Sequence, residues 1–198
     1  SYAHKFASKP EVIEGNKPYL YGQNGNPWTV SNAYAKVAGI EKVSGTTRPE
    51  RRGNGYCARL DAKLDSVVAM RIINLKVLVA GTLFTGRTLE PVGMGGTSDP
   101  YGVIDMGVPF TGHPTALMID YKAIVENSDV VTHAKAVAKP KYIKGRDCAE
   151  VYIYLQHRWE DADGKVHARR VGTGYYRIMN TVRDWQNDSR IPIRWGDI

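Results

Sequence analysis

The sequence predicts an all-β fold, an antiparallel β-sandwich, from three observations. Turn-forming residues are spread along the whole chain, with 20 glycines and 10 prolines among 198 residues, and they leave only short segments between them. These segments are rich in β-branched and aromatic residues, which pack well on a pleated surface. Helical periodicity is weak throughout, so short strands joined by turns favour a sandwich or barrel.

Five segments are the best strand candidates. They are residues 56–64, 75–84, 115–125, 149–159 and 172–179. Residues 181–187 are the best candidate for a helix, as a single turn. The Asp163-Gly164 pair predicts a hairpin turn that leads into a strand over 166–171. The acidic residues around it are predicted to form this turn and no calcium loop, because an EF-hand-type loop needs a longer ligand series and a terminal Glu.

Alternation along each strand indicates which side chains share a face, because successive side chains point to opposite faces. In residues 149–159 the apolar face holds Val151, Ile153 and Leu155. The opposite face is polar and aromatic and holds Glu150, Tyr152, Tyr154, Gln156 and Arg158. Residues 115–125 alternate in the same way, with Leu117, Ile119 and Tyr121 opposite Met118, Asp120 and Lys122. Residues 56–64 place Ala58, Leu60 and Leu64 opposite Arg59, Asp61 and Lys63.

The composition limits the class of protein. Hydrophobic residues make up 42% and charged residues 24% of the chain, which predicts a packed core in one large domain. The net charge of +7 comes from scattered cations without a basic helix or zinc knuckle, so no nucleic-acid partner is expected. Cys57 and Cys148 form no disulfide framework, and whether they pair is left open. No segment approaches the length of a membrane span, and no metal or cofactor motif is present.

Two motifs resemble a known family. Residues 80–87 carry a G-x-L-F-T-G element, and residues 107–117 carry the glycine, P-F-T and A-L positions of a G-x-P-F-T-x-R-P-x-A-L element. Together with the aromatic strand at residues 120–122, they resemble the putative carbohydrate metabolism domain family of Bacteroidetes. Weaker matches lie at residues 27–32, 56–60 and 150–155. His113 stands where the family has Arg, and Ala123 stands where it has a second aromatic residue.

The resemblance implies a jelly-roll fold like that of carbohydrate-binding modules. It implies one domain over residues 27–198, preceded by an N-terminal extension over residues 1–26. Family members continue for several more strands, so the chain is expected to be C-terminally truncated and to lack its last strands. The implied location is extracellular, at the outer-membrane surface or in the periplasm. A lipid anchor upstream of this sequence would be compatible with that location. The implied partner is a polysaccharide or oligosaccharide.

Three classes of function remain open from the sequence. The first is a glycan-binding module, whose ligand-binding residues would be Tyr152, Tyr154, Gln156, Arg158, Trp28 and Arg59, because aromatic rings cover sugar C–H faces and polar groups bind the hydroxyls. The second is a glycoside hydrolase using two of Asp61, Asp120 and Glu150, since that reaction needs two carboxyl groups about 5 to 9.5 Å apart. A plainer interpretation pairs these carboxylates with Arg59, Lys122 and Arg158. The third is a structural or adhesion module. The sequence does not identify the glycan or the oligomeric state.

Overall fold

The computed structural model describes residues 11–12, 19–20, 27–30, 32, 34–37, 40–43, 45–69, 73–88, 104–133 and 139–196. This part of the chain is all-β with antiparallel pairing, which confirms the predicted fold class. It contains no helix long and apolar enough to cross a bilayer. The chain forms two compact units, one of Ser1–Phe110 with His133–Lys141 and one of Thr111–Thr132 with Tyr142–Ile198. The jelly-roll topology and the single domain over residues 27–198 stay predictions.

The first unit is built mainly from antiparallel pairs of neighbouring strands. These strands are β1 (Glu11–Val12), β2 (Tyr19–Leu20), β3 (Trp28–Val30), β4 (Tyr34–Val37), β5 (Ile40–Val43), β6 (Thr47–Arg52), β7 (Gly55–Leu60), β8 (Ala62–Ala69), β9 (Ile73–Ala80), β10 (Leu83–Thr88) and β11 (Ile104–Met106). Four hairpin pairs form between β1 and β2, β4 and β5, β6 and β7, and β8 and β9. Strand β10 pairs with β3 on one side and with β11 on the other.

The hairpins of the first unit meet at Asp61, between β7 and β8. Its backbone N–H donates to the carbonyl of Thr46 (2.8 Å), and its carbonyl accepts from the N–H of Gly81 (2.7 Å). Thr46 and Thr47 are 0% and 2% exposed there. The predicted strand over 56–64 is therefore interrupted, because the Asp61 backbone bonds to two other segments.

The prediction of a core-facing apolar side for residues 56–64 is wrong for its leucines. Leu60 is 47% exposed and Leu64 is 45% exposed. They flank the interruption at Asp61 and lie on two different strands, so the alternation of a single strand does not apply across them. Close contact at Asp61 is made by backbone atoms of Thr46 and Asp61 around Gly81.

Two of the described sheets lie wholly in the second unit. Their strands are β12 (Ala116–Ala123), β15 (Ala149–Glu160), β16 (Val166–Ile178), β17 (Val182–Pro192) and β18 (Arg194–Trp195). Strand β12 pairs with β17, and β15, β16 and β18 form the other sheet. The paired strands β13 (Val130–His133) and β14 (Lys141–Lys144) include residues of both units.

The predicted helical turn over residues 181–187 is wrong, because this segment begins β17. Tyr121 of β12 is in register with Gln186, and Ala123 with Val182. Pairing with a neighbouring strand overrides the local preference of this short segment, as tertiary context commonly does.

The chain passes from one sheet of this unit to the other at Ile193. The Ile193 N–H donates to the carbonyl of Thr115 beside β12 (2.9 Å), and the next two residues pair with β16. Ile191 and Ile193 are 3% and 8% exposed. Gly174 of β16 leaves room for this crossing, since a Cβ there would lie 3.2 Å from the carbonyl oxygen of Pro192.

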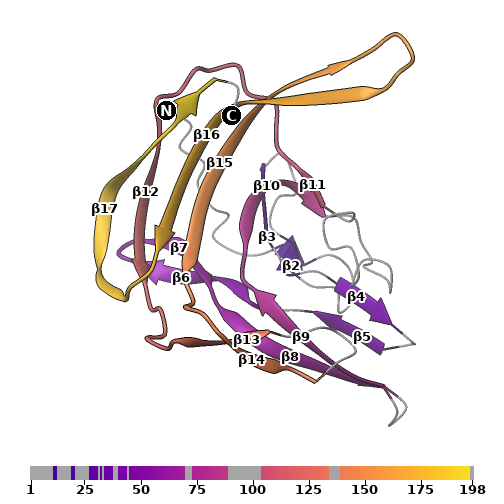
Figure 1. The fold of residues 1–198 in the computed structure, drawn as a ribbon, viewed down its shortest axis with the longest axis vertical. Helices are drawn as coiled ribbons and strands as arrows, with labels where there is room; N and C mark the ends of the chain where they lie inside the picture. The colour runs from indigo at the N-terminus through magenta and orange to yellow at the C-terminus, as the bar shows by residue number, and fades with distance from the viewer. Residues whose placement is uncertain are drawn as a thin grey trace. The chain divides into compact units, whose positions relative to one another are not determined.

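The predicted Asp-Gly hairpin is confirmed between β15 and β16. Its turn is closed by the Asp161 N–H donating to the carbonyl of Lys165 (3.0 Å), and Gly164 has a φ of 77°, which glycine adopts without steric cost. The register shifts once, since Gln156 faces Arg170 but Leu155 faces Gly172. Val171 is thus the extra residue of a β-bulge, and in Figure 1 the two strands bend part-way along their length.

Candidate functional site: the tyrosine face

The polar side of the β15–β16–β18 sheet carries a strip of aromatic and charged side chains, here called the tyrosine face. Strand β15 alternates as the sequence predicts, with Val151, Ile153 and Leu155 half-buried and the intervening residues exposed. Directly opposed residues of an antiparallel pair share a face. The register therefore adds six residues of β16 and one of β18. The tyrosine face consists of Glu150, Tyr152, Tyr154, Gln156, Arg158, Glu160, Val166, Ala168, Arg170, Thr173, Tyr175, Arg177 and Arg194.

Three tyrosine rings form the centre of the tyrosine face. The rings of Tyr152 and Tyr154 are stacked, with centroids 5.0 Å apart and planes 29° apart. Tyr175 is directly opposite Tyr152 on the neighbouring strand. All three side chains are between 43% and 46% exposed. This exposure is high for aromatic side chains that lie next to one another, and exposed aromatic clusters mark binding surfaces.

Glu150 sits at one end of the strip and is held by two donors. The Tyr175 hydroxyl donates to its Oε1 (2.5 Å), and the Arg177 Nε donates to the same oxygen (2.8 Å). The hydrogen bond from Tyr175, and then the one from Arg177, hold the pKa of the Glu150 carboxyl below its usual range. The same contact raises the pKa of the Tyr175 hydroxyl. Glu150 is therefore ionised at neutral pH, and its interactions resist the protonation that a general acid needs.

We expect Tyr175→Phe to raise the pKa of Glu150 toward its ordinary value, because the largest cause of the lowering is removed. A lowered folded pKa contributes stability above the unfolded value of about 4.3 and loses it as pH falls through the folded pKa. The variant should thus differ most from the parent protein at neutral pH and least near pH 2. Carbon-13 NMR of the glutamate carboxyls measures the shift.

The matched control for this change is Tyr176→Phe. The Tyr176 hydroxyl contacts that of Tyr121 (3.2 Å) on the opposite side of the sheet. Its removal should leave the pKa of Glu150 unchanged. An unchanged pKa of Glu150 in Tyr175→Phe would contradict the hydrogen bond from the Tyr175 hydroxyl to Glu150.

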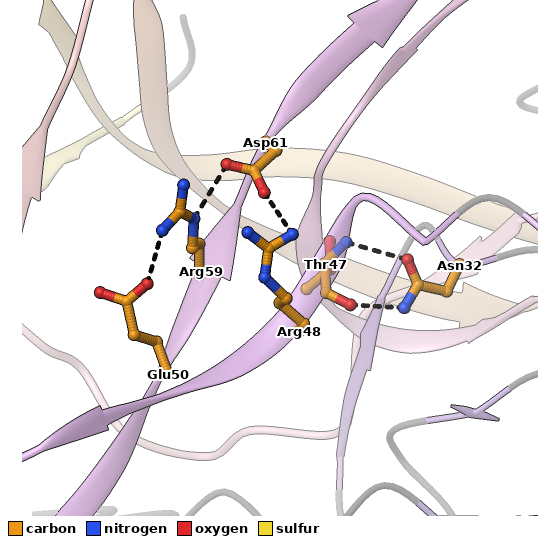
Figure 2. A network of polar contacts seen from close by, with 6 residues as sticks. All are labelled: Asn32, Thr47, Arg48, Glu50, Arg59 and Asp61. Atoms are coloured by element: carbon orange, nitrogen blue, oxygen red, sulfur yellow. Dashed lines mark hydrogen bonds and ion pairs between the residues drawn. The ribbon is translucent and has the colours of Figure 1, made fainter. Parts of the chain in front are cut away.

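Asp61, a predicted carboxylate candidate, lies in the first unit and is bound by two arginines. Arg48 contacts its Oδ2 (2.7 Å), and Arg59 donates to its Oδ1 (3.0 Å) and to Glu50 (2.9 Å). Figure 2 shows Asp61 between the two guanidinium groups. These contacts raise the pKa of Arg59, the hydrogen bond to Glu50 most. The two cations and two anions of this cluster balance in charge. The arrangement therefore favours ion pairing of Asp61 with arginine over a catalytic carboxylate pair.

Asn32 fixes the backbone beside this cluster. Its side-chain amide donates to the carbonyl of Thr47 (2.5 Å), and its side-chain oxygen accepts from the Thr47 N–H (2.9 Å). Both residues are buried, at 5% and 2% exposure, and Figure 2 shows the paired contacts. The asparagine of the weaker family match at residues 27–32 thus has a structural role, since it satisfies both backbone polar groups of a buried residue.

Asp120 and Glu150 both lie in the second unit, but they point to opposite sides of it. Asp120 is exposed between half-buried Ile119 and Tyr121, and it accepts a hydrogen bond from the Asp188 N–H (2.8 Å). Tyr121 contacts Tyr176, which faces the apolar side of the β15–β16 pair. The apolar sides of the two sheets therefore meet, and the two carboxylates project outward from different sheets.

The remaining predicted site residues lie in the first unit. Trp28 is half-buried on β3 opposite Thr85, and Arg59 is on β7. The structure describes each unit by itself, so neither residue is placed relative to the tyrosine face. Cys57 and Cys148 are free thiols, one in each unit. Among the described residues, no three His, Cys, Asp or Glu side chains gather as a metal site.

Sequence reasoning missed the part of the tyrosine face that comes from β16 and β18. Tyr175 and Arg177 lie within a predicted strand, but their face depends on the bulge at Val171. Arg194 lies in the last segment of the chain, where the family resemblance predicts a truncated domain. The only sequence signal for these residues was the hairpin turn, which indicates that the flanking strands pair.

Comparison with known proteins adds one finding. The family model described as "Putative carbohydrate metabolism domain" matches residues 7–186. No curated protein and no solved structure matches the chain.

Proposed function

Because the chain belongs to the putative carbohydrate metabolism domain family, we propose that it is a secreted or cell-surface carbohydrate-binding module that recognises a polysaccharide or oligosaccharide for utilisation. The glycan lies along the tyrosine face. The observation that carries this proposal is the stacked pair of Tyr152 and Tyr154, which is exposed at the centre of a polar strip.

The chemistry of the strip suits a sugar chain. A pyranose presents an apolar C–H face, which an aromatic ring covers, and a rim of hydroxyls, which need donors and acceptors. Tyr152 supplies one ring, and Tyr154 supplies a second that also contacts the Arg170 guanidinium (4.0 Å). Gln156 follows them on the same face with both a donor and an acceptor. Same-face neighbours on a strand are about 6.8 Å apart, so these groups form a line suited to an extended ligand.

Binding accounts for the carboxylates better than cleavage does. Glycoside hydrolysis needs one carboxyl group protonated and another nearby. The pKa of Glu150 is lowered by Tyr175 and Arg177, and Asp120 projects from the other sheet. Neither observation supports an acid–base pair on the tyrosine face.

The double variant Tyr152→Ala, Tyr154→Ala tests the proposal. Truncation of a central aromatic contact costs about 1–2 kcal/mol, and about 1.4 kcal/mol corresponds to a tenfold change, so we expect a roughly 100-fold loss of affinity. A glycan array first identifies the polysaccharide, and affinity gel electrophoresis then compares the variants. Tyr142→Ala is the control, because Tyr142 lies on β14 and is 78% exposed.

Two results with a bound glycan, and the absence of any binding, would overturn the proposal. One is unchanged glycan binding by the double variant, which would move the site elsewhere. The other is release of reducing sugar from the bound glycan that disappears in Glu150→Gln, which would make the chain a hydrolase. Absence of binding to every polysaccharide tested would favour a structural or adhesion module.

A further inference from the structure

We infer that the tyrosine face selects an anionic polysaccharide, whose carboxylate or sulfate groups are bound by Arg158, Arg170 and Arg194. The inference rests on the proposed function and deepens it, because it names the chemical class of the glycan.

The tyrosine face carries a net positive charge. The face carries four arginines and two carboxylates, which gives 4 − 2 = +2. Glu150 is already bound by Arg177 (2.8 Å), and Glu160 lies at the hairpin end of the strip. The other three arginines are exposed and form no ion pair with any described carboxylate. A neutral glycan does not need such a surplus, whereas an anionic one is attracted by it.

Arg170 is positioned inside the aromatic strip. Its guanidinium Cζ lies 4.0 Å from the centroid of the Tyr154 ring. This contact holds the guanidinium beside the ring, and no described carboxylate pairs with its N–H donors, which can therefore bind a ligand. That fork matches the two oxygens of a carboxylate or sulfate. A sugar held beside Tyr154 would therefore bring its charged substituent next to Arg170.

Arg194 extends the same row across the sheet. Tyr154 is opposite Thr173 on β16, and Thr173 is opposite Arg194 on β18. Adjacent strands are about 4.8 Å apart. Tyr154 and Arg194 lie on either side of Thr173, so their backbones are separated by about twice that distance. Their side chains share the tyrosine face, because directly opposed residues point to the same side.

Arg158 continues the strip toward the hairpin turn. It lies four residues beyond Tyr154 on the same face, about 14 Å along the strand. Cations spread over this length suit a polymer that repeats its charge. A small anion would need them gathered around one point.

The test compares polysaccharides that differ only in charge. Polygalacturonate is paired with its methyl-esterified form, and dextran sulfate with neutral dextran, so the two arms distinguish carboxylate from sulfate. We expect tight binding to at least one charged form, at least about tenfold weaker binding to its neutral partner, and weakening by added salt. A single-stranded oligonucleotide tests whether any polyanion is enough.

Three substitutions locate the effect on the arginines. The triple variant Arg158→Gln, Arg170→Gln, Arg194→Gln should lose at least about tenfold in affinity for the charged glycan. Arg170→Lys keeps the charge but loses the planar fork, so it should also weaken binding. Arg183→Gln is the control, since this exposed arginine lies on β17 in the other sheet. Circular dichroism verifies that each variant is folded.

The outcomes separate this inference from the proposed function. Equal binding to charged and neutral glycans that still requires Tyr152 and Tyr154 would overturn the anionic class and leave the glycan module standing. Equal binding of the oligonucleotide, with the same loss in the triple variant, would overturn it too. Failure to bind any polysaccharide would remove both.

Discussion

Gly81→Ala is expected to destabilise the first unit by about 3–5 kcal/mol, an unusually large cost for one methyl group. A Cβ at position 81 would lie 2.7 Å from the Asp61 backbone nitrogen and the Thr46 carbonyl oxygen, and 2.8 Å from the Asp61 carbonyl oxygen. All three are backbone atoms, and the Asp61 nitrogen already donates to Thr46 (2.8 Å). None can move without breaking a hydrogen bond that joins two hairpins.

Amide hydrogen exchange of the first unit measures this effect. We expect protection to fall in β6 to β10 and to persist in the second unit. Gly45→Ala is the matched control, because its added Cβ meets nothing within 4 Å although it lies beside Thr46. Wild-type protection of β6 to β10 in Gly81→Ala would show that the crossing at Asp61 is not as close as described.

This crossing also gives a physical reason for the family motif. Gly81 is the first glycine of the G-x-L-F-T-G element, and Gly86 is the last. The Gly86 N–H donates to the carbonyl of Pro27 (2.9 Å), and its own carbonyl accepts from the hydroxyl of Thr29. The motif therefore joins β10 to β3 and closes the crossing. It shapes the fold, whereas the tyrosine face lies outside the two strongest motifs.

Properties that depend on neighbouring residues in one strand could be predicted from the sequence. The two faces of β15 follow from the alternation of Val151, Ile153 and Leu155 with polar residues, and the structure confirms them. The hairpin turn was equally local, because Asp163-Gly164 determines it. The helical prediction at residues 181–187 failed because its outcome depends on pairing with β12, which lies far away in sequence.

The far half of the tyrosine face could not be predicted, because it depends on one extra residue. If the register next to the hairpin turn continued along β15 and β16 without a bulge, Tyr176 would lie opposite Glu150. The bulge at Val171 shifts the register, so Arg177 faces Glu150 and Tyr175 faces Tyr152. A one-residue slip moves every later side chain to the other face. The bulge therefore decides that Glu150 has a cationic partner.

Gly174→Val is expected to destabilise the second unit by about 2–4 kcal/mol. A Cβ there would lie 2.9 Å from Ile153 Cγ2 and 3.2 Å from the carbonyl oxygen of Pro192, and valine adds two methyl groups to it. The competing effect is the β-propensity gained by replacing glycine, which is worth only about 1 kcal/mol. The steric cost should prevail, since the Pro192 backbone is held where Ile193 bonds to Thr115.

Urea unfolding followed by tryptophan fluorescence measures this change, because three of the four tryptophans lie in the second unit. Thr173→Val is the control on the same strand for stability alone, because Thr173 itself belongs to the tyrosine face. It keeps the shape and removes a buried hydroxyl that has no hydrogen-bond partner, so it should be neutral or slightly stabilising. Because Gly174 packs on the apolar side of the sheet, its replacement should also tilt β16 relative to β15 and weaken the stacking of Arg170 on Tyr154. Glycan affinity should then fall together with stability, although residue 174 cannot reach a ligand on the tyrosine face. A stable Gly174→Val protein with full affinity would contradict the close packing that we assign to this glycine.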